Sequence, residues 1–200
     1  MIDLPPISMP PPGYEQTKAA VVACGVPATN IRLLYEEELQ SDVVRISDLG
    51  GTDEARLQCL RRAVHPFYVI EIENEAQRNA YFAFASREDG RAFRTDAIAW
   101  LEENRMIDRV PHYDPARGIE TFARALEAAC ELRPGTALEV VRPTTITFRR
   151  DYLERRFGDH DAGSGDDMVC LGRFFAASNA DEHGIGLGFI GQAAVQDEQR

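Results

Sequence analysis

Residues 30–47, NIRLLYEEELQSDVVRIS, contain the pattern on which the prediction of the fold depends. Both halves of this segment place apolar side chains at every second position, at Ile31, Leu33, Tyr35, Val44 and Ile46. Alternation with a period of two is typical of a strand that buries one of its faces. The segment therefore predicts a hairpin that turns near residues 40–42.

A helix is predicted on each side of this hairpin. Residues 14–24 lead into Gly25, and a glycine can adopt the left-handed conformation in which helices often end. Residues 52–65 form the second helix, for which Thr52 is the expected N-cap. Its apolar stripe consists of Leu57, Leu60 and Val64. The sequence thus predicts a hairpin with a helix before it and a helix after it.

The segments farther along the chain are also predicted as helices and strands. Residues 67–73, FYVIEIE, are rich in aromatic and β-branched side chains, which predicts a central strand. Three helices are expected next, with a break at residues 86–90 and with Asp114 as the N-cap of the third. Strands are expected at residues 136–141 and 144–148. Two further helices and a Gly-rich strand complete the order.

This order of elements predicts an α+β fold with a mostly antiparallel sheet of about five strands packed against several helices. We find no internal repeat at a fixed period in the sequence. Residues 14–200 are expected to form a single globular domain, and residues 1–13 a Pro-rich, flexible N-terminal segment. One hydrophobic core is expected to include Leu57, Leu60, Phe67, Val69, Phe122 and Leu126.

The segment HGIGLGFIG, residues 183–191, contains the spacing G-x-G-x-x-G that phosphate-binding loops use. Such loops follow a strand and open a helix, but the residues printed after Gly191 leave no room for the rest of that unit. Gly184, Gly186 and Gly188 instead predict one bare face of a strand, which we expect to lie under a helix or beside a partner chain. We therefore expect no nucleotide and no other cofactor.

Composition limits the classes of partner. The formal net charge of −11 opposes binding to nucleic acid, since it repels phosphate backbones. No run of apolar residues is long enough for a membrane span, so we expect a soluble protein. The N-terminal residues show no signal-peptide pattern, which predicts a cytoplasmic protein as the sequence is written. The alternative is a periplasmic protein whose signal peptide has been removed.

Four cysteines lie far apart, and each has apolar neighbours: Cys24, Cys59, Cys130 and Cys170. Four buried thiols are the simplest interpretation, because free cysteine behaves as a small hydrophobic residue. Their even number also allows disulfides if the protein is exported. Cys24 and Cys59 are then the expected pair, because their two helices flank the same predicted hairpin.

The segment GDHDAGSGDD, residues 158–167, is the most site-like part of the sequence. Asp159, His160 and Asp161 are candidate ligands for a divalent cation. The spacing does not match an EF-hand loop, and an acidic loop whose last aspartates cap the next helix accounts for the same residues. We therefore predict no metal site and keep these three residues as candidates.

Two functions from different classes agree with these observations. The first is a non-enzymatic module that binds a protein partner, with the Gly-rich strand accepting a strand of that partner. The second is a small hydrolase or metal-dependent enzyme that uses the acidic residues 158–167 together with His160 or His183. No motif of a nucleophile, a general base or a metal site is found in its required context. We therefore favour the binding module.

Overall fold

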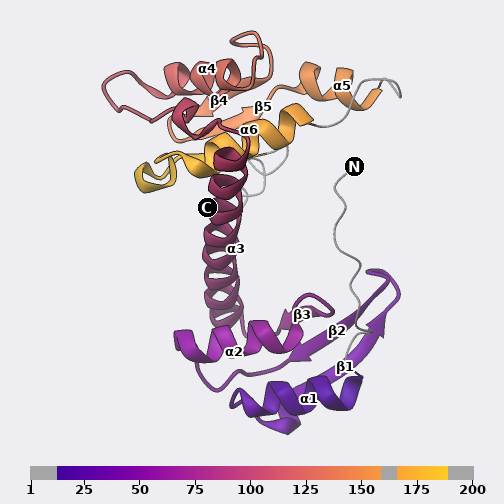
Figure 1. Cartoon of the computed structure of the whole chain (residues 1–200). Helices are drawn as coiled ribbons and strands as arrows, with labels where there is room; N and C mark the ends of the chain where they lie inside the picture. Colours follow the sequence, from indigo (N-terminus) through magenta and orange to yellow (C-terminus); the bar gives the residue numbers. More distant parts are fainter. Residues whose placement is uncertain (1–12, 159–165, 189–200) are drawn as a thin grey trace. The chain divides into compact units, whose positions relative to one another are not determined.

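The computed structural model describes residues 13–158 and 166–188 (Figure 1). The chain divides into two compact units, Met1–Asp89 and Gly90–Arg200. The predicted α+β class is confirmed. The predicted single sheet of about five strands was wrong, because each unit contains its own three-stranded mixed sheet. The prediction of one domain over residues 14–200 stays a prediction.

The first unit is an α-β-β-α-β arrangement followed by the start of a long helix. Its elements are α1 (Tyr14–Ala23), the 3-10 helix η1 (Ala28–Asn30), β1 (Ile31–Glu36), β2 (Ser41–Ile46), α2 (Glu54–Val64) and β3 (Val69–Ile72). α1 ends as predicted, since Cys24 is its C-cap and Gly25 has a φ of +88°. The N-cap of α2 is Asp53 rather than the predicted Thr52, and its side chain accepts a hydrogen bond from the backbone of Arg56.

The first sheet has the order β1-β2-β3. β1 and β2 form the predicted antiparallel hairpin, in which Leu33 lies opposite Val44. β3 runs parallel to β2 and places Ile70 opposite Val44. The prediction of a central strand here was wrong, because β3 is an edge strand of the described sheet. α2 explains the parallel direction, since a helical crossover returns the chain to the same end of the sheet.

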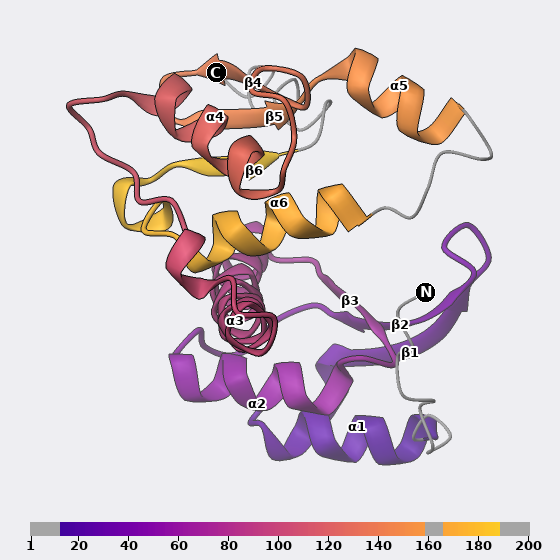
Figure 2. The same ribbon diagram turned by 45° about the horizontal axis from the view of Figure 1, so that its top comes forward.

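One face of this sheet packs against α1, α2 and the N-terminal part of the long helix. Val21 of α1 and Leu60 of α2 are fully buried beside Ile46 of β2 in this cluster. Figure 2 shows α1 and α2 side by side in this unit. Val69 lies outside the cluster and is 39% exposed, so its predicted place in the core was wrong.

The long helix is α3, Glu75–Glu103, which runs through the predicted break at residues 86–90 (Figure 1). The prediction of two helices here was wrong. Gly90 lies within α3, and a Cβ atom built on it would meet no other atom within 4 Å. A single glycine in a helix interior lowers stability without ending the helix.

The second unit has the same kinds of element. They are the 3-10 helix η2 (Ile107–Arg109), α4 (Ile119–Ala129), β4 (Leu138–Arg142), β5 (Thr145–Phe148), α5 (Arg150–Gly158), α6 (Asp166–Ala177), the 3-10 helix η3 (Asp181–His183) and β6 (Gly186–Gly188). α4 starts five residues later than the predicted cap at Asp114. The Asp114 side chain instead accepts a hydrogen bond from the backbone of Ala116, and Gly118 adopts a φ of +78° before the helix begins.

The second sheet has the order β4-β5-β6. β4 and β5 are antiparallel, with a register shift between Val140 and Arg142, and β6 runs parallel to β5. A separate cluster of buried residues lies against this sheet and includes Leu126 of α4, Ile146 of β5 and Leu171 of α6. The prediction of one core was wrong, because the described residues form two hydrophobic clusters, one in each unit.

Candidate interaction site

The three candidate metal ligands, Asp159, His160 and Asp161, lie outside the described residues. In the described part of the chain, no group of three or more histidine, cysteine, aspartate or glutamate side chains could hold a metal ion. The helices of that part also lack the combination of length and apolarity that a membrane span requires.

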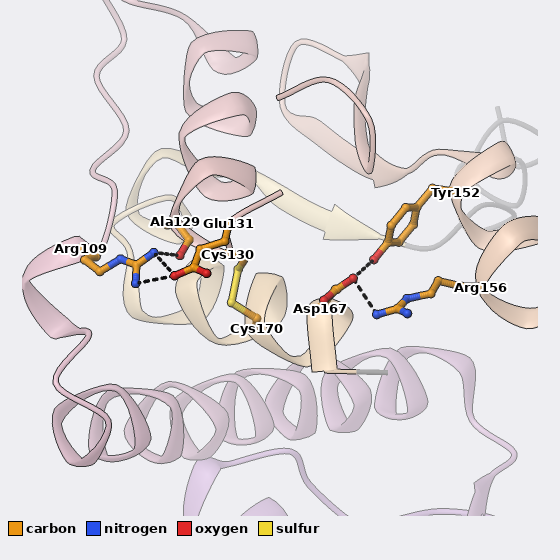
Figure 3. Close-up of a disulfide and its surroundings, with 8 residues drawn as sticks. All are labelled: Arg109, Ala129, Cys130, Glu131, Tyr152, Arg156, Asp167 and Cys170. Carbon is orange, nitrogen blue, oxygen red and sulfur yellow. Dashed lines mark hydrogen bonds and ion pairs between the residues drawn. A yellow bond between two sulfur atoms is a disulfide. The ribbon is translucent and has the colours of Figure 1, made fainter. Parts of the chain in front are cut away.

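Asp166 and Asp167 are the first two residues of α6, where their negative charge suits the positive end of the helix dipole, and the expectation that they cap the helix stays a prediction. Asp167 accepts a hydrogen bond from Arg156 Nη2 at 2.6 Å and one from the Tyr152 hydroxyl at 3.4 Å (Figure 3). Burial raises the pKa of Tyr152, and the nearby guanidinium of Arg156 acts in the opposite direction. Asp167 thus joins α5 to α6, and its carboxylate is already occupied by side chains of the protein.

Glu36 at the end of β1 and Glu71 in β3 both form ion pairs that stabilise the first sheet. Arg45 lies between two carboxylates, with Nε 2.5 Å from Glu71 and Nη2 3.3 Å from Glu36. The hydrogen bond with Glu71 raises the pKa of Arg45, so the guanidinium keeps its charge. Arg45 thus forms an ion pair with each of the two carboxylates, and the three side chains together form a charge network on one face of the sheet.

All four cysteines are joined in disulfides. Cys24 at the end of α1 is bonded to Cys59 of α2, with an S–S distance of 2.01 Å. Cys130 at the end of α4 is bonded to Cys170 of α6, with an S–S distance of 2.19 Å (Figure 3). The interpretation of four buried thiols was therefore wrong. The second pair was not predicted, although its cysteines lie in two predicted helices in the same way as the first pair.

The end of α4 beside the second disulfide is held by Arg109. Its Nη2 atom donates to the carbonyl oxygen of Ala129 at 2.7 Å, and both Nη atoms lie 3.4 Å from Glu131 (Figure 3). A basic side chain at a helix C-terminus satisfies carbonyl groups that have no partner within the helix. The polar side chains beside this disulfide therefore stabilise the end of α4.

The segment before β6 is fixed by polar contacts from two other parts of the second unit. Arg94 Nη1 donates to the carbonyl oxygen of Ser178 at 2.8 Å and to Asp181 at 3.0 Å. Asn179 exchanges two hydrogen bonds with the backbone of Tyr113, at 2.7 and 3.2 Å. The Tyr113 ring also lies edge-on to His183, with centroids 5.2 Å apart. These contacts hold the entry to β6 in one position.

The predicted Gly-rich strand is confirmed for Gly186–Gly188 but differs in two respects. Gly184 has a φ of +68° and ends η3, so it does not belong to the strand face. A Cβ atom built on Gly186 would meet no described atom within 4 Å. None of the described helices therefore contacts this position, and the alternative of a partner chain beside the bare face stays a prediction.

β6 differs from the other edge strands of the two described sheets in its lack of protection. Natural edge strands carry charged residues or bulges that prevent pairing with other chains. The other edges have such residues, namely Arg32 and Glu36 in β1, Glu71 in β3, and Glu139 and Arg142 beside the irregularity of β4. The sequence of β6, Gly-Leu-Gly, contains neither a charge nor a proline. This edge is the best candidate for an interaction site among the described residues.

Comparison of the chain with protein-family models, with curated proteins and with solved structures gives no match.

Proposed function

We propose that the protein is a binding module that accepts an extended segment of a partner protein along the edge of β6 that no described strand pairs with. In this mode of recognition the partner adds a strand to an exposed sheet edge, and main-chain hydrogen bonds provide the affinity. The observation that carries the proposal is the unprotected edge of β6. The polar contacts that hold the segment before β6 in place support the proposal further, because a preorganised edge loses less conformational entropy on binding.

The backbone of β6 determines which groups such a segment would meet. The N–H of Gly186 donates to the carbonyl oxygen of Thr144 at 2.9 Å, toward β5. Main-chain groups of successive residues in a strand point to opposite edges of the strand. The N–H and C=O of Leu187 therefore point away from β5, while its side chain packs on the second hydrophobic cluster. Leu187 is the residue whose backbone would pair with the partner.

Charge favours one kind of partner. The chain carries a formal net charge of −11, so a second copy of the chain is repelled and a basic segment is attracted. We therefore propose an extended partner segment that contains lysine or arginine. Electrostatic attraction of this kind raises the association rate and weakens with increasing salt.

The compartment that we propose is oxidising. All four cysteines are paired, and disulfides persist in secreted and periplasmic proteins but are rare in reducing compartments. This favours the exported alternative over the cytoplasmic one.

The test compares two substitutions at Leu187 in the full chain. A phage-displayed library of random dodecapeptides is selected against the wild-type protein, and a selected peptide is synthesised and titrated. Leu187→Pro removes the outward N–H, and proline is tolerated at an edge position whose N–H faces away from the sheet. Leu187→Ala is the control, because it removes the same side chain and keeps the N–H.

We expect Leu187→Pro to weaken peptide binding about tenfold, because a main-chain hydrogen bond is lost, and Leu187→Ala to change it much less. The selected peptides should be basic, and their affinity should fall as salt is raised. Equal weakening by both substitutions would contradict strand addition at this edge. Concentration-dependent dimerisation that Leu187→Pro abolishes would show that a second copy is the occupant and would overturn the proposed partner.

A further inference from the structure

The two units share one topology. In each unit a helix, α1 or α4, is followed by an antiparallel hairpin, and the chain returns through α2 in the first unit and through α5 and α6 in the second to a third strand that runs parallel to the second strand. The sheet orders, β1-β2-β3 and β4-β5-β6, are the same. Figure 2 allows this course of the chain to be followed within each unit. The similarity concerns the order, direction and connections of all three strands.

The disulfides occupy equivalent positions in the two units. The first cysteine of each pair is the C-cap of the first helix, Cys24 after α1 and Cys130 after α4. The residue that follows has a positive φ in both cases, +88° at Gly25 and +60° at Glu131. A left-handed residue after the C-cap is a common helix ending, and here it gives the chain the same local course after both cysteines.

The second cysteine of each pair lies in the helix that leads to the third strand. Cys59 is followed in α2 by Leu60, and Cys170 is followed in α6 by Leu171. Both leucines are fully buried, each in the hydrophobic cluster of its own unit. The two helices thus turn the same face toward their sheets at the disulfide.

The registers of the two sheets also agree. In each sheet, a buried residue of the middle strand lies between an apolar residue of the hairpin partner and an apolar residue of the parallel strand. The two rows are Leu33, Val44 and Ile70 in the first unit, and Val140, Ile146 and Leu187 in the second.

We infer that the chain is an internal duplication of one α-β-β-α-β module, in which each copy has its own core and its own disulfide. The cysteines of a pair are separated by 35 residues in the first copy and by 40 in the second. An insertion that contains α5 and residues 159–165 separates the second strand, β5, from the second helix, α6, in the second copy only. This unequal length explains why the sequence shows no repeat at a fixed period.

The test measures hydrogen–deuterium exchange by mass spectrometry on the full chain and on two double variants. Cys24→Ser with Cys59→Ser should accelerate amide exchange in α1, α2 and the first sheet by an order of magnitude or more, and leave α4, α6 and β4–β5 unchanged. Cys130→Ser with Cys170→Ser should give the reverse pattern. Each variant is the matched control of the other.

A second pair of variants keeps both disulfides, in case removal of a disulfide prevents folding. Leu60→Ala and Leu171→Ala create cavities at equivalent positions, and each should accelerate exchange only in its own unit. Faster exchange in both units after either single substitution would overturn the inference of two modules that each have their own core. Exchange of the free protein does not involve the partner segment, so this test can fail independently of the proposed function.

Discussion

Glu127 shows how a single buried residue can determine a connection between two elements. Its side chain is fully buried, and its carboxylate accepts hydrogen bonds from the backbone N–H groups of Gly135, Ala137 and Leu138. The bonds to Ala137 and Leu138 measure 2.7 and 2.9 Å. Gly135 and Ala137 belong to the connection between α4 and β4, and Leu138 is the first residue of β4, so the carboxylate fixes the start of the strand to the helix.

Removal of this carboxylate should be costly. We expect Glu127→Ala to lower the free energy of unfolding by about 3 kcal/mol, because three backbone donors lose their acceptor. Glu127→Gln should cost less, because the amide retains one acceptor oxygen. The measurement is urea denaturation, with the exposed Arg124→Ala on the same helix as the control. A loss for Glu127→Ala as small as that of the control would contradict the role of Glu127.

Sequence reasoning could not identify Glu127 as a structural residue. The apolar stripe of its helix was predicted, and Phe122 and Leu126 are buried as expected. The partners of Glu127, however, lie 8 to 11 residues away in an irregular segment, and no helix or strand period connects them. Candidate site residues are subject to the same limit. The conformation of Gly184 and the open space beside Gly186 depend on tertiary structure, although the glycine spacing did indicate a strand.

At the level of the elements, α3 is the clearest departure from the predicted secondary structure. The segment 86–90 contains Gly90 and charged residues, which favours a turn in isolation. Within the protein, Tyr81 and Phe84 pack into the first cluster and Leu101 into the second, so both ends of the helix are held by tertiary contacts. Tertiary packing of the ends overrides the weak local preference between them.

A continuous helix at Gly90 predicts the effect of one substitution. Gly90→Ala should raise the free energy of unfolding by about 0.5–1 kcal/mol, since alanine has the higher helix propensity and its Cβ would meet no other atom within 4 Å. Thermal and urea unfolding measure this change. Destabilisation by alanine would show that the chain turns at Gly90 and would contradict the single helix.

The elements that sequence patterns predicted well are those whose signals are local. The hairpin of β1 and β2, the end of α1 at Gly25 and the strands around Pro143 are all present. The predicted start of α4 was misplaced. Aspartate is favoured both in turns and at helix N-caps, and Asp114 lies in a turn. Local sequence patterns therefore predicted most of the helices and strands but misplaced some of their boundaries.

At the level of the whole molecule, the number of sheets and cores could not be predicted from periodicity. A period of two indicates which side chains of a strand are buried, but it does not indicate which strands share a core. The direction of β3 and β6 depends on the helical crossovers that precede them. The assumption of one sheet therefore merged strands that belong to two.

The proposed oxidising compartment predicts the state of the cysteines in protein taken from its native host. The protein is unfolded in an alkylating agent without prior reduction and analysed by mass spectrometry. We expect no modified cysteine, and four after reduction, because both pairs are bonded. Four modified thiols without reduction would support a reducing compartment and contradict the proposed export.

The pairing of neighbouring cysteines along the chain has a consequence for biosynthesis. Four cysteines can pair in more than one way, but here the first is bonded to the second and the third to the fourth. A chain that leaves the ribosome or crosses a membrane from its N-terminus exposes Cys24 and Cys59 before Cys130. An oxidant that joins thiols in their order of emergence would produce this pattern directly, without exchange between disulfides.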